Sequence, residues 1–141
     1  MPAQTDLAFD TPGPGFTEIT RPIADWVRAN APAGPAALTA HLRHTSASLL
    51  IQENADGDVR RELEDFFGRL APPADAPGMA WIRHRAEGPD DMPAHMRAAL
   101  LPVSLTIPVR DGALALGTWQ GLFLVEHRDR PHRRTVTLHL A

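Results

Sequence analysis

Three histidines stand where the sequence pattern changes, and imidazole is a common ligand of transition metals. His44 and His84 each close a segment with strand-like periodicity, and His95 lies near the start of a predicted helix. Three neutral imidazoles and an open fourth position suit a catalytic divalent metal, most often zinc. For each of the 7 His in the chain, the alternative is an ordinary surface or hydrogen-bonded core residue. The other histidines are assigned to this ordinary class: His41, His127, His132 and His139.

Two adjacent carboxylates precede the last of these candidate ligands. Asp91 is expected to be the N-cap of the helix that carries His95, and this task explains its presence. Asp90 has no such task. It is a candidate to orient an imidazole, or to bind the metal or a magnesium ion.

Another polar pair, Glu53-Asn54, follows the apolar run 49–51. Glu53 is either a solvated strand end or a general base near the metal, in which case burial has to raise its pKa. Later in the chain, the segment 117–121 interrupts a predicted strand with two glycines and Trp119. Such a segment either faces a ligand or forms a corner of the sheet that Trp119 packs.

Four arginines lie in the connection to the last predicted strand: Arg128, Arg130, Arg133 and Arg134. Guanidinium groups hold phosphate well, although a solvated basic turn is the simpler interpretation.

Composition limits the chemistry further. The 141 residues include 14 Arg and 17 acidic residues but no Cys, Lys or Tyr. Disulfides, thiolate chemistry, Schiff bases and Walker-type phosphate loops are therefore excluded. A net charge of -3 and 6% aromatic residues do not favour nucleic-acid binding. With no signal peptide and no long apolar run, we expect a single cytoplasmic domain over residues 1–141 with no membrane contact.

The periodicity predicts mainly antiparallel strands with two or three short helices, a single α+β domain. Strands are expected at 4–9, 37–44, about 49–51, 79–83, 103–107, 113–126 and 134–140. Helices are expected after Thr20, which is the predicted N-cap of the first, over 58–70 and over 91–101. The helix over 58–70 is predicted to be capped by Asp56. Its expected buried stripe consists of Val59, Leu63, Phe66, Phe67 and Leu70.

Five motifs, in this order, resemble those of the YjbQ family, whose members are commonly labelled secondary thiamine-phosphate synthases. They are HTSAS at 44–48, Glu53-Asn54, the segment 87–95, GTWQG at 117–121, and Glu126-His127-Arg128 with Arg133-Arg134. The resemblance extends from about Leu7 to Leu140 and implies a bifurcated β-sandwich assembled as a homotrimer.

The resemblance also implies a site. Its metal ligands would be His44, His84 and His95, and the ion a divalent metal, expected to be Zn, with Mg possible beside a diphosphate. Glu53 or Asp90 would handle protons or position the substrate. The residues implied to bind substrate are Asn54, Thr118, Trp119, Gln120, Arg133 and Arg134.

The implied reaction joins an aminopyrimidine methyl diphosphate to a thiazole phosphate and releases pyrophosphate. The label "secondary" suggests a side activity of a site for another small phosphorylated molecule. Two alternatives stay open: a trimeric metal- or anion-binding protein without catalysis, and a metal-dependent hydrolase. One residue departs from the family pattern, because Pro102 stands where glycine is common, and proline has no N–H to offer a phosphate.

Overall fold

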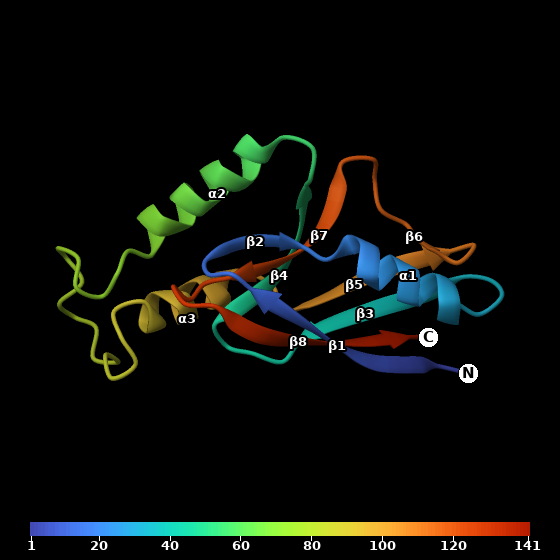
Figure 1. The fold of residues 1–141 in the computed structure, drawn as a ribbon, viewed down its shortest axis with the longest axis horizontal. Helices are drawn as coiled ribbons and strands as arrows, with labels where there is room; N and C mark the ends of the chain where they lie inside the picture. Colours follow the sequence, from blue (N-terminus) through green and yellow to red (C-terminus); the bar gives the residue numbers. More distant parts are fainter.

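The computed structural model describes residues 1–141, and its strands form two antiparallel sheets flanked by three helices (Figure 1). The larger sheet has the order β1 (Ala3–Thr11), β8 (His132–Leu140), β3 (Ala36–Leu42), β5 (Ser104–Arg110) and β6 (Ala113–Leu114). The smaller sheet has the order β2 (Gly15–Glu18), β7 (Gln120–Glu126) and β4 (Ala47–Glu53). The expected α+β fold with antiparallel strands is confirmed.

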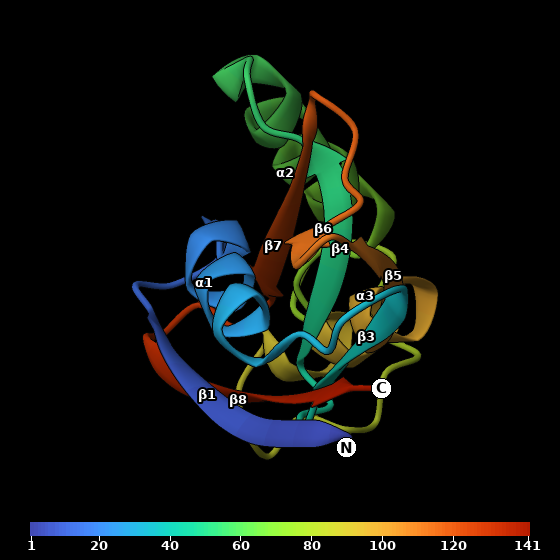
Figure 2. The same ribbon diagram turned by 90° about the vertical axis from the view of Figure 1, so that its right-hand side faces the viewer.

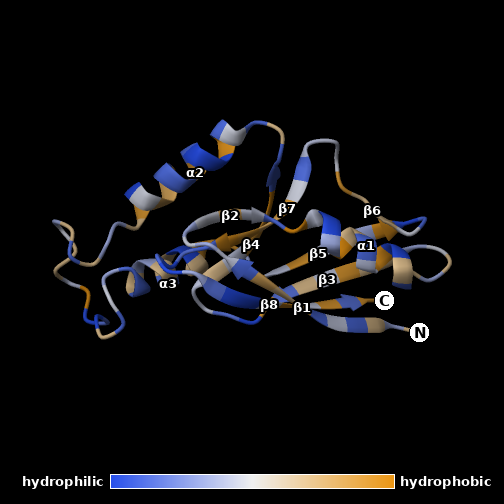
Figure 3. Cartoon of the chain, viewed as in Figure 1, coloured by the Kyte–Doolittle hydropathy of each residue, from blue (hydrophilic) through white to orange (hydrophobic).

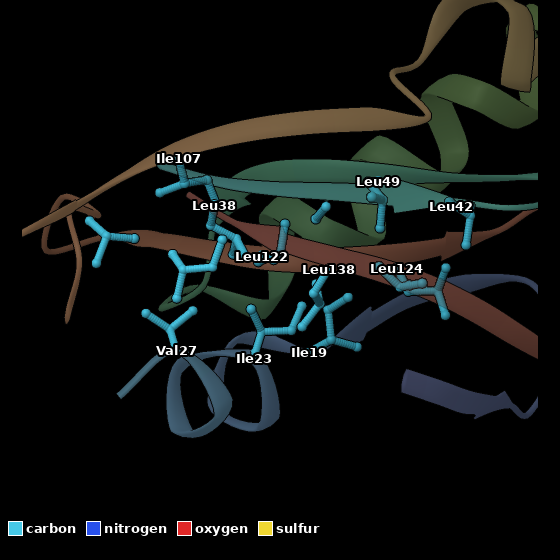
Figure 4. Packing of buried hydrophobic residues seen from close by; sticks show 14 of the residues in the cluster. Ile19, Ile23, Val27, Leu38, Leu42, Leu49, Ile107, Leu122, Leu124 and Leu138 are labelled. Atoms are coloured by element: carbon cyan, nitrogen blue, oxygen red, sulfur yellow. The ribbon is translucent and has the colours of Figure 1, made fainter. Parts of the chain in front are cut away.

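The main core lies between the two sheets and helix α1 (Thr20–Asn30). In β3, Leu38, Ala40 and Leu42 are buried while His41 is exposed, which is the alternation that a half-buried strand requires. Figure 2 shows α1 in the angle between the sheets, and Figure 4 shows its buried side chains against strand residues of both. The buried apolar side chains of both sheets and of α1 therefore form one shared core.

Helix α2 (Gly57–Leu70) begins where the sequence predicts, because the Asp56 side chain accepts a hydrogen bond of 2.9 Å from the Asp58 amide. Of its expected buried stripe, Phe67 is buried and Val59 and Leu63 are half-buried, whereas the prediction is wrong at Phe66 and Leu70. Phe66 is 54% exposed and Leu70 48% exposed. The reason is that α2 stands away from the sheets, with apolar positions on its surface (Figures 1 and 3).

Three other expectations need correction. Residues 79–83 form turns, because the Arg85 guanidinium donates to the carbonyls of Ala74, Met79 and Ile82 and folds this segment back on itself. The expected strand over 113–126 is two strands, β6 and β7, separated by the segment 115–119. Thr20 lies in the first turn of α1, after the N-cap residue.

Candidate metal centre

Three side chains, those of His84, Asp91 and His95, converge beside the third helix, α3 (Asp91–Leu100), and their ligand atoms lie within 4.8 Å of one another. The Nε2 atom of His84 is 2.6 Å from Oδ2 of Asp91, and Nε2 of His95 is 3.3 Å from the same oxygen. Two imidazole nitrogens and one carboxylate oxygen thus face a common point.

Local helix geometry places two of the three groups together. Asp91 and His95 are four residues apart, and this spacing puts both on one face of α3. The prediction that Asp91 caps the helix is wrong. Asp90 holds the N-cap position without a side-chain capping bond, and Asp91 is the first residue of the helix. The Asp91 carboxylate is therefore free for the histidines, and its side chain is only 2% exposed.

The ring of His95 is oriented by the backbone. Its Nδ1 atom lies 3.0 Å from the carbonyl oxygen of Thr45, and a carbonyl can only accept, so Nδ1 carries the proton. In the neutral ring the Nε2 atom keeps its lone pair, and it lies 3.3 Å from Oδ2 of Asp91. Histidines that bind metals usually have this arrangement, in which the second ring nitrogen donates to a carbonyl.

The two carboxylate oxygens of Asp91 have different partners, and Arg128 contacts one of them. Its Nη1 atom lies 2.9 Å from Oδ1 of Asp91, which leaves Oδ2 for the histidines. Burial raises the pKa of the Asp91 carboxyl, but the hydrogen bond with His84 and the charge of Arg128 outweigh burial and hold that pKa below its usual value. Asp91 is thus an anion, as a metal ligand has to be.

These donors fit a divalent metal. Two histidines and one carboxylate form a known catalytic ligand set for zinc and, in a facial arrangement, for non-haem iron. The side chains of His84 and His95 are 47% and 33% exposed, so the cluster is open to solvent on one side.

The third predicted ligand, His44, lies outside this cluster. Its Nε2 atom accepts a hydrogen bond of 2.8 Å from the Thr135 amide, and its Nδ1 atom is 3.4 Å from Nη1 of Arg134. Burial and the charge of Arg134 lower the pKa of His44 and keep its ring neutral. His44 and His95 line one shallow groove of about 310 Å³, so the two rings are neighbours although their nitrogens face different partners.

Of the two predicted catalytic carboxylates, Asp90 lies beside the cluster. Its Oδ2 atom accepts from Nε of Arg128 at 2.8 Å and from the Asp129 amide at 3.0 Å. Burial raises the pKa of Asp90, and these two hydrogen bonds outweigh it and lower that pKa. Asp90 therefore fixes Arg128 against Asp91.

The other predicted catalytic residue, Glu53, lies at the far end of β4 from the histidines. The residues of β4 from Ala47 to Glu53 extend over about 20 Å at the usual strand rise. Asn54 and the segment from Thr118 to Gln120 lie at this same tip, where the Asn54 amide bonds to the Trp119 carbonyl and Trp119 is 63% exposed. Within one chain these residues do not share a cleft with the histidines.

The two arginines predicted to bind substrate have other partners. Arg134 is buried, with its Nε and Nη2 atoms on the Glu126 carboxylate at 2.8 and 2.5 Å. Arg133 is exposed and pairs with Asp10 on β1 at 3.2 Å. At the position of the unusual proline, the Pro102 carbonyl accepts a bond of 2.8 Å from the Leu49 amide. Pro102 therefore contributes to the backbone pairing of β4 without an N–H.

Sequence reasoning missed the contributions of Asp91 and Arg128. A signal for Asp91 was present, since an acid four residues before a histidine on a helix shares its face. No such signal existed for Arg128, whose contact with Asp91 joins positions far apart in the sequence.

Fold and site together define an α+β protein of two antiparallel sheets that carries a cluster of two histidines and an aspartate at the start of a helix. The chain belongs to the YjbQ family: the family described as "UPF0047 protein YjbQ-like" matches residues 5–141.

Relatives and solved structures agree with this assignment. The chain is 55% identical over 103 residues to a UPF0047 protein of Synechocystis, covering 73% of this chain and 67% of that one. It is 45% identical over 114 residues to UPF0047 protein YjbQ of Salmonella typhimurium, covering 81% and 79%. A conserved hypothetical protein of Thermus thermophilus superposes with a TM-score of 0.78 at 32% identity, covering 95% and 97%. A YjbQ/UPF0047 protein of Clostridium acetobutylicum superposes with a TM-score of 0.75 at 29% identity, covering 96% and 97%. No helix of the chain is long and apolar enough to cross a membrane.

Proposed function

We propose that the chain is a divalent-metal enzyme that acts on a small phosphorylated substrate, with thiamine-phosphate synthesis as its reaction type. The observation that carries the proposal is the sharing of one oxygen, Asp91 Oδ2, by the Nε2 atoms of His84 and His95 while Arg128 holds the other oxygen. The three ligand atoms lie within 4.8 Å of one another, and Zn is the ion expected to bind them.

In the proposed reaction, a thiazole nitrogen donates its electron pair to the methylene carbon of an aminopyrimidine methyl diphosphate. The C–N bond forms, the C–O bond to the diphosphate breaks, and pyrophosphate leaves with that electron pair. No oxidant or reductant is needed. When bound, a divalent cation acts as a Lewis acid that offsets negative charge on a departing diphosphate.

Arginine side chains beside the cluster supply further positive charge. Arg128 and Arg130 line a cavity of about 460 Å³ with the loop from Ala86 to Asp90. Arg128 is already engaged by Asp90 and Asp91, whereas Arg130 is exposed and forms no ion pair. Arg130 is therefore the proposed contact for a substrate phosphate, in place of the expected Arg133 and Arg134.

The homotrimer that the resemblance implies would give the remaining predicted residues a place. The tip of β4 lies at the opposite end of the strand from the cluster and carries Glu53, Asn54 and Thr118 to Gln120. These residues could therefore contribute only to the metal site of a neighbouring copy of the chain. Light scattering tests this part, and a monomeric mass would remove these residues from the proposed site.

The metal claim is tested by elemental analysis of protein purified without added metal and then titrated with zinc. We expect about one bound ion per chain, and its loss in Asp91→Asn and His95→Ala. His41→Ala is the matched control, because His41 is exposed and its side chain makes no hydrogen bond. His44→Ala distinguishes the two ligand sets, since retained metal supports the cluster with Asp91 and lost metal supports three histidines. Unchanged metal content in both Asp91→Asn and His95→Ala would refute the centre.

The reaction is tested by pyrophosphate release from the two thiamine precursors with metal-loaded protein, with Asp91→Asn as the inactive control. A hydrolase is the second candidate, favoured by the 47% exposure of His84, which leaves the cluster accessible to water. Phosphate release that does not depend on the thiazole would establish hydrolysis instead. Bound metal without either activity would support a metal-binding protein.

A further inference from the structure

A second cavity, of about 290 Å³, lies where α2, β2, the end of β7 and α3 meet. Phe16 and Phe67 form an aromatic wall, with ring centroids 6.4 Å apart and planes inclined by 20°. Arg97 reaches this cavity from α3. Because Arg97 follows His95 by two residues, roughly 200° around the helix, it projects from a different face than the metal ligands. The cavity is therefore separate from the metal centre.

Arg97 brings to this cavity a positive charge that has no ion-pair partner. Its Nη2 atom donates to the Ala71 carbonyl at 2.9 Å, its Nε atom is enclosed by the chain, and its Nη1 atom stays accessible without a hydrogen bond. No carboxylate lies within 4.0 Å of the guanidinium, although Asp129 lines the same cavity. The Nη1 atom is therefore the donor that Arg97 can offer to an acidic group in the cavity.

His127 lines the same cavity and is only 3% exposed. One ring nitrogen, Nε2, is 2.9 Å from Ser48 Oγ, and the other has no partner within the chain. Burial, reinforced by the charge of Arg97, lowers the pKa of His127 to about 4, so the ring is neutral near pH 7. His127 thus offers the cavity a single neutral hydrogen-bonding position beside the guanidinium.

Negative charge lines another part of the cavity. Glu64 and Asp65 of α2 contribute carboxylates that make no hydrogen bond or ion pair within the chain. The Glu64 carboxylate lies directly over Gly15, where a Cβ would collide with its Oε1 atom. Glu126 also borders the cavity, but Arg134 neutralises it, and Asp129 lies outside ion-pair distance of Arg97.

We propose that this cavity binds a small zwitterion, with its acidic group against Arg97 and His127 and its protonated amine against Glu64 and Asp65. The two sets of charges do not neutralise each other within the chain, and a molecule with opposite charges at its two ends satisfies both. A simple anion would be repelled by the carboxylates of Glu64 and Asp65, and a simple amine would be repelled by the Arg97 guanidinium. Aromatic side chains cover the part of the ligand between its charged ends.

The acidic group of the ligand is a carboxylate or a phosphate. Calorimetric titration of the full chain with γ-aminobutyrate and with phosphoethanolamine distinguishes these two sources. Inorganic phosphate, propionate and ethanolamine serve as probes that carry a single charged group. We expect at least one zwitterion to bind at least tenfold more tightly than each probe that carries only one charged group.

Variants connect the binding to this cavity. Arg97→Gln and Glu64→Gln should each weaken zwitterion binding by about tenfold or more. Arg69→Gln is the matched control, because Arg69 is an exposed cation of α2 outside the cavity. Arg97 also anchors the end of α2 through Ala71, so Glu64→Gln, an exposed change, keeps the test valid if Arg97→Gln fails to fold.

Three results would overturn the proposal: no zwitterion binding at millimolar concentration, a probe with one charged group binding as tightly as the tighter zwitterion, or unchanged zwitterion affinity in Glu64→Gln. Metal content is unaffected in each case, so failure here is distinct from failure of the metal centre.

Discussion

Lowering the pH should destabilise the fold through His127. In the folded chain, burial and the charge of Arg97 lower the pKa of His127 to about 4, whereas an unfolded histidine titrates near 6.5. Between these values the unfolded chain binds a proton that the folded chain excludes, so stability falls as the pH falls. The contribution of neutral His127 to the free energy of unfolding is fully present above about pH 6.5 and is lost by about pH 4. At about 1.4 kcal/mol per pH unit, the full effect is about 3 kcal/mol, of which about 2 kcal/mol is lost between pH 7.5 and pH 5.

Urea unfolding at pH 7.5 and at pH 5 measures this loss, and His127→Gln removes it. The pH difference in unfolding free energy should shrink by about 2 kcal/mol in that variant. Comparing each variant with itself at two pH values cancels any packing change that the substitution causes. His41→Gln, on the exposed face of β3, should keep the wild-type difference. An undiminished pH difference in His127→Gln would refute the reasoning, and would mean that His127 is protonated or solvated in the folded chain. His44, whose pKa is also lowered by burial, adds to the wild-type loss in the same direction.

Four substitutions test the packing elsewhere. Glu126→Gln should cost about 3–5 kcal/mol of unfolding free energy, because it leaves the Arg134 guanidinium buried without its counter-charge, whereas Asp10→Asn breaks an exposed pair and should cost at most about 1 kcal/mol. Gly68→Ala should stabilise α2 by about 0.5–1 kcal/mol, since a Cβ there meets nothing within 4 Å. Gly121→Ala should lower the free energy of unfolding by about 1–3 kcal/mol, because the new Cβ would lie 2.9 Å from the Cβ of Asn54. Urea unfolding measures all of these, and a stabilising Gly121→Ala or a neutral Glu126→Gln would contradict the packing described.

Periodicity predicted the parts of the fold whose burial follows from the local sequence. In β3 and β8, apolar and polar residues alternate because one face of each strand meets the core. The strand expected over 79–83 failed because Met79 and Ile82 are buried by turns that Arg85 holds, and apolar residues in such a cluster mimic a strand. In α2 the apolar residues have the correct helical spacing, but whether they are covered depends on how the helix stands relative to the sheets. No pattern within α2 determines that position.

The candidate site shows the same division between local and distant causes. Sequence spacing placed His95 beside a carboxylate pair, and the structure brings His84 and His95 close to one of these carboxylates. Sequence reasoning assigned the two carboxylates the wrong way round, because capping propensity does not distinguish adjacent aspartates at a helix start. Arg128 decides between them: with Nε on Asp90 and Nη1 on Asp91, it holds Asp90 outside the helix and turns Asp91 inward. Since Arg128 lies beyond the end of β7, the position of the Asp91 carboxylate beside the two histidines depends on a tertiary contact. The group that lies within 4.8 Å of both histidine nitrogens is therefore the Asp91 carboxylate, while the His44 nitrogens face Thr135 and Arg134.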